Sequence, residues 1–156
     1  MARTSKSGEA RPAKPCKFCE IVAGREKGYT VFSDEHAVAF LDYRPLLIGH
    51  VLLIPRTHYA NLEDIPAEVL ARLGKRIKPL SAAVTEALGA EGSFIALNNK
   101  VSQSVPHVHF HVVPRRHDDH LFSAKLVWRR MNYRAASHRE ETAAKIRAAL
   151  AQRGGK

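Results

Sequence analysis

The stretch that decides the fold reads His107-Val108-His109-Phe110-His111-Val112-Val113, in which histidines alternate with apolar residues. Successive side chains of a β-strand point to opposite faces of a sheet, so the three imidazoles would line one face, roughly 7 Å apart. The apolar residues between them would be buried on the other face. Because a hydrophobic core does not need three neighbouring histidines, we infer that this strand carries chemistry.

The histidines are open to three interpretations. A neutral imidazole is a good nucleophile near pH 7, and its attack on phosphorus would give a phosphohistidine-type intermediate. Alternate histidines on a strand can instead bind zinc. In the third interpretation they are ordinary surface residues, which the strict alternation of three disfavours.

The segments on either side of this strand favour a phosphate ligand. A polar loop, residues 98–106, precedes it and carries amides and hydroxyls that can donate to phosphate oxygens. Arg115 and Arg116 follow it and add positive charge. Asn and Ser are also ordinary turn residues, so the loop supports a phosphate site only together with the histidines.

Composition is that of one domain with a core, since the chain has 156 residues of which 45% are hydrophobic. The net charge is +10, which leaves nucleotides and nucleic acids open as ligands, or reflects nothing more than solvated surface charge. No apolar run approaches transmembrane length, and residues 1–14 have the composition of a disordered basic tail and not of a secretory signal. Two cysteines without a disulfide framework indicate a reducing, cytoplasmic setting.

Apolar runs bounded by turn residues predict five strands with short connections, which favour antiparallel pairing. The predicted strands cover residues 29–33, 37–41, 51–54, 94–97 and 107–113. Asp34-Glu35 supplies a hairpin turn between the first two.

Helical spacing of apolar residues predicts a helix that begins near Pro66, with Asp64 as its cap, and stops at Gly89. Pro79 should kink or split this helix. A second helix is expected over residues 139–152. Five strands and two main helices predict an α+β domain.

The chain resembles the histidine triad (HIT) family, in particular its bacterial nucleotide hydrolase and transferase branch. The signature of the family is His, apolar, His, apolar, His, apolar, apolar, as in residues 107–113. The upstream segments 40–56 and 16–24 also resemble family members. The resemblance implies a HIT-like antiparallel sheet with two helices, usually as a homodimer. We accordingly divide the chain into a tail (1–14), a HIT domain (15–135) and a C-terminal helix and tail (136–156).

The resemblance also implies roles for individual residues. His109, the middle histidine, would attack the α-phosphate of a nucleotide and form a nucleotidyl-histidine, while His111 donates to the phosphate. Ser104 and Gln103 match positions that contact the phosphate and the leaving group, and His50 matches a supporting histidine. The nucleotide-binding positions carried over are Asp42 for the ribose hydroxyls, Phe18, Ile21, Phe40 and Leu52 for the base, and Asn98 or Asn99 for a polar contact.

Cys16 and Cys19 have the spacing of half a zinc site. His58 and His107 match the positions that complete this site in zinc-carrying family members, so structural Zn²⁺ is expected on these four residues. A redox pair is the rival interpretation, although such pairs commonly open a helix after a strand and no strand is predicted before Cys16.

Two departures from the family pattern concern the substrate site. Ser102 stands where many members have glycine, and the segment Trp128-Arg129-Arg130 lacks the proline that often follows the tryptophan. The expected substrates are nucleoside phosphoramidates or dinucleoside polyphosphates, with adenine or another purine as the base. Two other functions are compatible with parts of the sequence: a basic nucleotide- or RNA-binding protein with vestigial activity, and a zinc hydrolase that uses the triad as ligands. The complete set of catalytic positions disfavours the first, and the cysteine pair disfavours the second.

Overall fold

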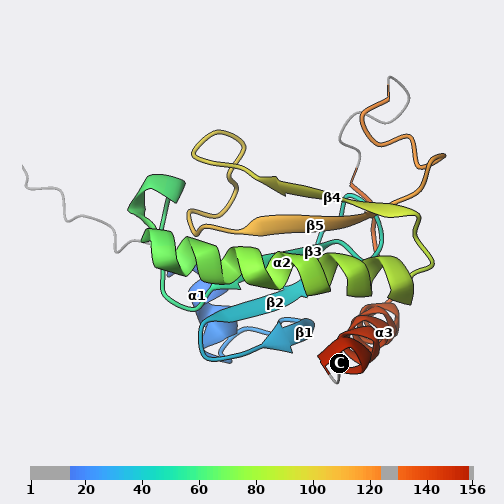
Figure 1. The fold of residues 1–156 in the computed structure, drawn as a ribbon, viewed down its shortest axis with the longest axis horizontal. Coiled ribbons are helices and arrows are strands. Elements are labelled where there is room, and N and C mark those ends of the chain that lie inside the picture. Colours follow the sequence, from blue (N-terminus) through green and yellow to red (C-terminus); the bar gives the residue numbers. More distant parts are fainter. Residues whose placement is uncertain (1–14, 124–129, 155–156) are drawn as a thin grey trace, which may run out of the picture.

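A five-stranded antiparallel sheet forms the centre of the computed structural model, which describes residues 15–123 and 130–154 (Figure 1). Its strands are β1 (Thr30–Ser33), β2 (Ala37–Leu41), β3 (Val51–Pro55), β4 (Gly92–Leu97) and β5 (Phe110–Arg115). Their order across the sheet is β1-β2-β3-β5-β4, and every neighbouring pair is antiparallel. The predicted α+β class is thereby confirmed. The proposed tail, residues 1–14, lies outside the described residues, as do Trp128 and Arg129.

The two faces of the sheet have different coverings. Side chains alternate along β2 and β3, so Ala39 and Leu53 pack with helices α2 (Ala67–Ala87) and α3 (Ala136–Gly154) on one face. Phe40 and Leu52 point to the opposite face, where they pack with the short helix α1 (Lys17–Val22). Both strands are therefore buried along their whole length. The face under α1 is the one on which the site lies.

The long helix α2 follows Pro66, as predicted, but Asp64 does not cap it. Asp64 instead ends a short 3₁₀ helix (Leu62–Asp64), where its carboxylate accepts the backbone N–H of Asn61 at 3.1 Å. Of the two outcomes expected at Pro79, a kink or a split, the split does not occur, because α2 is continuous. Pro79 and Lys75, whose carbonyl loses its helical partner, both face solvent, where water can satisfy that carbonyl.

The hairpin and the second main helix correspond to the predictions. The side chain of Asp34 accepts the backbone N–H groups of His36 and Ala37, both at 2.9 Å, and closes the β1–β2 turn. Helix α3 begins at Ala136 rather than at Arg139 and buries Ile146 against the core. Helix α1 was not predicted, because six residues are too few for a periodic pattern.

The histidine stretch needs a correction. Strand β5 begins only at Phe110, so His107 and His109 lie on the irregular segment that leads into it. The ring centroids of His109 and His111 are 4.9 Å apart, closer than the spacing of an ideal strand. The surface interpretation is wrong, since the three histidines are 0%, 3% and 8% exposed.

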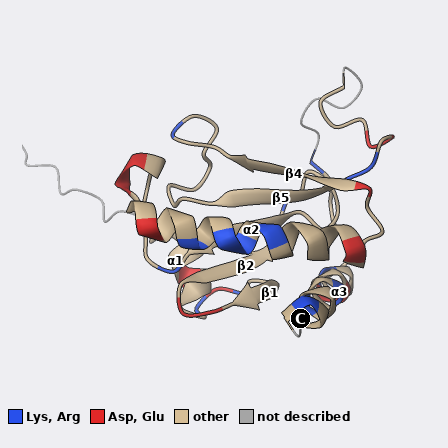
Figure 2. Cartoon of the chain, viewed as in Figure 1, with Lys and Arg blue, Asp and Glu red and all other residues tan. Residues whose placement is uncertain are grey.

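Charged residues occur on the helices and in the loops between the strands. Figure 2 shows Lys and Arg in the middle of α2 and acidic residues near its ends. Part of this charge is paired, since Arg76 forms an ion pair with Asp34. None of the described helices has the length and apolar character needed to cross a membrane.

Candidate active site and metal centre

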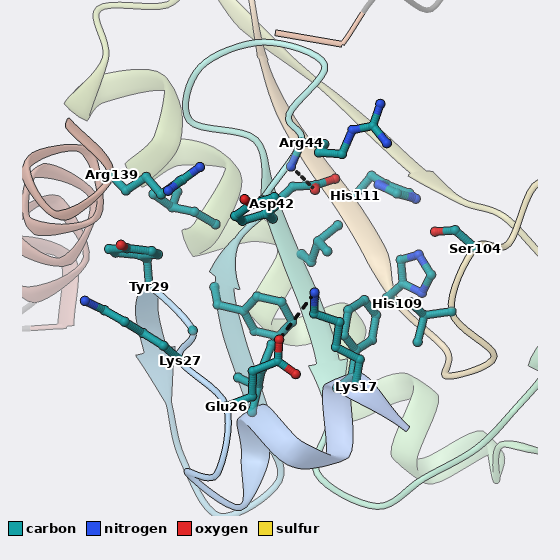
Figure 3. A pocket seen from close by; sticks show the side chains of 18 of the residues that line it. Lys17, Glu26, Lys27, Tyr29, Asp42, Arg44, Ser104, His109, His111 and Arg139 are labelled. Carbon is teal, nitrogen blue, oxygen red and sulfur yellow. Dashed lines mark hydrogen bonds and ion pairs between the residues drawn. The ribbon is translucent and has the colours of Figure 1, made fainter. Parts of the chain in front are cut away.

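The α1 face of the sheet holds a cavity of about 760 Å³ (Figure 3). Phe40 and Leu52 form its floor, and Phe18 and Ile21 of α1 form one wall. The other wall comes from the segment 42–44 that follows β2, together with Arg130 and Arg139. His109 and His111 close one end. All four apolar residues that the resemblance assigned to a base therefore line one cavity with the second and third histidines.

The ring of His109 is held by a backbone carbonyl. Its Nδ1 lies 2.6 Å from the carbonyl oxygen of His107. A carbonyl oxygen only accepts, so Nδ1 must carry the proton and Nε2 keeps its lone pair. Burial lowers the pKa of His109 below its usual 6.5, although the His107 carbonyl and the charge of Asp42 act against this shift. A neutral imidazole with a free Nε2 is the form that can act as a nucleophile.

His111 is oriented by a chain of two further contacts. The backbone N–H of Leu46 donates to Nδ1 of His50 at 3.2 Å, which places the proton of His50 on Nε2. That nitrogen lies 2.9 Å from Nδ1 of His111 and donates to it. His111 therefore carries its own proton on Nε2. Burial lowers the pKa of His111 to about 4, with the charges of His109 and Arg130 acting in the same direction, so the ring is a neutral donor beside His109.

Asp42 lies between β2 and the following turn, in the wall of the cavity. One carboxylate oxygen accepts the backbone N–H of Arg44 at 2.8 Å, and the other accepts the guanidinium of Arg130 at 3.1 Å. Burial raises the pKa of Asp42, while both partners oppose that shift. A carboxylate has room for more than two hydrogen bonds, so these contacts leave acceptor capacity for a ligand hydroxyl.

The polar loop before the triad divides its side chains between the cavity and the scaffold. Ser104 lines the cavity beside His109 (Figure 3). Gln103 does not line it: its amide donates to the Ala60 carbonyl and accepts the Lys100 N–H, both at 2.7 Å. Gln103 therefore stabilises the conformation of the loop. Ser102, in the same loop, has φ of 60°, in the left-handed region where glycine is favoured.

The two asparagines point in different directions. The side-chain amide of Asn98 lies 3.4 Å from Nε2 of His111. Asn99 instead accepts the backbone N–H of Leu62 at 2.8 Å and donates to the carboxylate of Glu63 at 3.1 Å. Asn98 is thus the one of the pair that faces the histidines.

The first triad histidine belongs to a different cluster. Nδ1 of His107 lies 3.5 Å from Sγ of Cys16, and Nδ1 of His58 lies 3.4 Å from Sγ of Cys19. The four donor atoms are all within 4.8 Å of one another. Cys16 caps α1 and Cys19 lies in its first turn, which brings both sulfurs to the same side. Two thiols and two imidazoles are a donor set for tetrahedral Zn²⁺.

Two observations favour a metal at this cluster over a redox pair. Two imidazoles join the two thiols, with all four donor atoms within 4.8 Å of one another. Nε2 of His107 lies 3.0 Å from the carbonyl oxygen of Pro55, which places the proton there and leaves Nδ1 as the ligand atom. The triad is therefore shared, with His107 at the metal cluster and the other two histidines at the cavity.

Known proteins resemble this chain both in sequence and in structure. The family model of the HIT domain matches residues 24–118. The chain belongs to the HIT family. A HIT-like protein of Saccharolobus solfataricus is 46% identical over 101 residues, which cover 64% of this chain and 73% of that protein. The adenosine 5′-monophosphoramidase HNT1 of Saccharomyces cerevisiae is 33% identical over 118 residues, covering 74% and 72% of the two chains.

Among solved HIT structures, a Zn-bound histidine triad protein from Mycobacterium smegmatis is similar over nearly the whole chain. Its TM-score is 0.78 and its identity 38%, with 90% of this chain and 96% of that chain covered. Cys16 and Cys19 lie before the segment that the HIT family model matches. Arg130 and Arg139, which also line the cavity, lie after it; Arg130 belongs to the segment 128–130 that the resemblance linked to the substrate, whereas the sequence analysis missed Arg139.

Proposed function

We propose that this HIT protein is a nucleotide hydrolase or transferase that acts at the α-phosphate through His109. The observation that carries the proposal is the 2.6 Å contact from Nδ1 of His109 to the His107 carbonyl, which leaves Nε2 as the nucleophile in a cavity of nucleotide size. The relative named adenosine 5′-monophosphoramidase supports the same class of reaction.

The reaction balances in two steps. Nε2 of His109 forms a bond to the α-phosphorus, the bond from phosphorus to the leaving group breaks, and the leaving amine or phosphate departs with the bonding electrons and takes a proton from solvent. Water or inorganic phosphate then attacks the phosphorus, the bond from phosphorus to Nε2 breaks, and a proton of an attacking water returns to solvent. His111 donates from Nε2 to a phosphate oxygen, where negative charge grows in the transition state. Ser104 lies beside His109 and would contact the phosphate or the leaving group (Figure 3). Gln103 supports this loop, and His50 orients His111.

The rest of the nucleotide follows from the cavity wall. Asp42 would accept the ribose hydroxyls, since a carboxylate suits a cis-diol. The base would lie between Phe18 and Ile21 on one side and Phe40 and Leu52 on the other, in the apolar part of the cavity. Asn98 lies beside His111 and would therefore contact the phosphate group. The expected substrates are purine nucleoside phosphoramidates or dinucleoside polyphosphates.

Zinc would be held by Cys16, Cys19, His58 and His107, whose donor atoms already converge. A bound metal would tie α1 to the segment that precedes β5, and so fix one cavity wall and the carbonyl that orients His109. The metal has a structural role in this proposal, and no step of the reaction passes through it.

We also propose a homodimer in the cytoplasm. Strand β4 is an edge strand with side chains that are largely only half-buried, and Ile95 is 37% exposed. The unpaired backbone groups of such an edge can pair with a strand of a second chain. Size-exclusion chromatography with light scattering would test the dimer.

A substrate panel tests the function. Purified protein is incubated with adenosine phosphoramidate or diadenosine tetraphosphate, with and without inorganic phosphate, and quenched samples are examined for a nucleotidyl adduct on His109 by mass spectrometry. The proposal expects turnover and an adduct that is absent in His109→Ala. The alternative, a basic nucleotide- or RNA-binding protein, expects salt-dependent affinity for RNA and no turnover of any substrate.

A further inference from the structure

Arg139, on α3, lines the end of the cavity that lies away from the histidines (Figure 3). Its side chain forms no hydrogen bond or ion pair with any described residue, and its Nε is buried without a partner. Because Nε is enclosed by the protein, the donors of Arg139 that can meet a ligand in the cavity are those of its two Nη atoms, and a ligand that supplies acceptors would pair them. Two other cations of the cavity differ, since Arg130 is paired with Asp42 and Lys17 with Glu26. Lys27 and Arg44 also line the cavity, but the guanidinium of Arg139 is the one that packs against three rings.

The guanidinium of Arg139 is confined by three tyrosine rings. Its Cζ lies 4.6 Å from the ring centre of Tyr43, 5.5 Å from that of Tyr133 and 5.7 Å from that of Tyr29. Helix α3 is itself anchored, because Arg147 donates to the carbonyl of Thr30 at 2.7 Å and Ile146 is fully buried. The donors of Arg139 are therefore held in place before any ligand arrives.

The order of groups along the cavity matches the order of groups in a nucleotide. Figure 3 shows His109 at one end, Asp42 in the middle and Arg139 with Tyr29 at the other end. With the phosphorus at His109 and the ribose at Asp42, the outer edge of the base meets Arg139. This placement rests on the proposed function.

We propose that Arg139 reads the base and selects guanine, by donating to O6 and N7. These two acceptors are adjacent on the edge of guanine and suit the planar fork of a guanidinium. Adenine offers N7 as an acceptor but an amino group beside it, which would face a second donor.

The test compares kcat/KM for guanosine and adenosine 5′-phosphoramidate in the wild type, Arg139→Met, Arg139→Lys and Arg153→Met. Arg153 lies on the same helix outside the cavity, where it pairs with Glu86, so its variant controls for lost charge. The wild type and Arg153→Met should prefer guanosine by roughly 10-fold or more. Both Arg139 variants should lose the preference, because Lys keeps the charge but not the fork.

Equal kcat/KM values for the two bases in the wild type would overturn the proposal while leaving the nucleotidyl transfer intact. So would a preference that survives in Arg139→Met or in Arg139→Lys. If neither phosphoramidate is turned over, the proposed function fails, and calorimetric affinities for GMP and AMP then decide the role of Arg139 by the same comparison. Equal affinities, or a difference that Arg139→Met leaves unchanged, would refute it.

Discussion

Nδ1 of His109 lies 2.6 Å from the carbonyl oxygen of His107, while the imidazole of His107 points the other way, toward Cys16 and Cys19. One residue therefore contributes its backbone to the nucleophile and its side chain to the metal cluster. The two sites share no side chain, but they share this peptide unit. A displacement of His107 should therefore change the geometry of both sites.

His109→Ala should reduce turnover by roughly 10³-fold or more, because the variant cannot form the covalent intermediate. The fold should persist, since the ring faces a cavity. Circular dichroism and thermal unfolding provide the control for folding. Residual activity within tenfold of the wild type would show that another group attacks the phosphorus.

Asp42→Asn should raise KM and reduce discrimination between ribose and 2′-deoxyribose substrates. A hydrogen bond to a charged group contributes about 1.5–3 kcal/mol, so the wild type should prefer the ribonucleotide by roughly 10-fold to 100-fold. Glu26→Gln is the matched control, because it also removes a cavity carboxylate, one that is paired with Lys17. Unchanged discrimination in Asp42→Asn would mean that the hydroxyls bind elsewhere.

Cys16→Ser should lose the metal, which we expect at about one zinc per chain by elemental analysis of unchelated protein. A ligand that binds only the folded state at 100 times its Kd stabilises it by about 2.7 kcal/mol, so the melting temperature should fall by several degrees. His117→Ala, at an exposed histidine outside the cluster, should leave both values unchanged. Wild-type protein without zinc would contradict the four-ligand site.

After a chelator has removed any metal, the free energy of unfolding of the protein should fall as the pH drops below about 6.5. Burial lowers the pKa of His50 well below its usual 6.5, so the unfolded chain takes up a proton on this residue before the folded protein does. That difference favours unfolding progressively at acidic pH. Urea titrations at a series of pH values should show a smaller loss for His50→Gln than for the wild type. Parallel curves for the two proteins would exclude His50 as a cause.

Gly49→Ala should destabilise the protein by at least about 1–3 kcal/mol. Gly49 has φ of 91°, and a Cβ there would lie 2.0 Å from Cδ1 of Leu88. Gly74→Ala is the control, since nothing lies within 4 Å of its Cβ position in helix α2. It should be neutral or stabilising by up to about 1 kcal/mol, as alanine favours a helix. Denaturant unfolding measures both, and similar values would exclude the clash.

The sequence predicted the sheet, its antiparallel pairing and the two main helices because long apolar patterns mark them. Local polar chemistry was harder. Asp64 precedes Pro66 and looks like a cap, yet its carboxylate bonds to Asn61 in the turn before the helix. The alternation of residues 107–113 predicts one continuous strand. At its start, however, the backbone N–H of Val108 donates to the carbonyl of Tyr59 and not to a neighbouring strand of the sheet.

In the candidate site, too, some residues could be predicted from the sequence and others could not. The positions matched to a family signature converge in the structure, apart from Gln103 and Asn99, whose amides bond to the scaffold. Arg130 and Arg139 reach the cavity from the C-terminal part of the chain. Arg130 lies in the segment 128–130 that the resemblance linked to the substrate, whereas Arg139 reaches the cavity through the packing of α3, which no local pattern in the sequence records.

The separation of the two sheet faces has a consequence for how such a protein can change. Most side chains of the core under α2 and α3 do not line the cavity, and the floor residues Phe40 and Leu52 belong to a separate apolar cluster; Leu41, Tyr29 and Arg139 of α3 are the exceptions. Substitutions on the floor that adapt the pocket to a new nucleotide can therefore accumulate without loosening the helical layer. Selection for a different substrate and selection for thermal resistance would act on largely separate sets of positions.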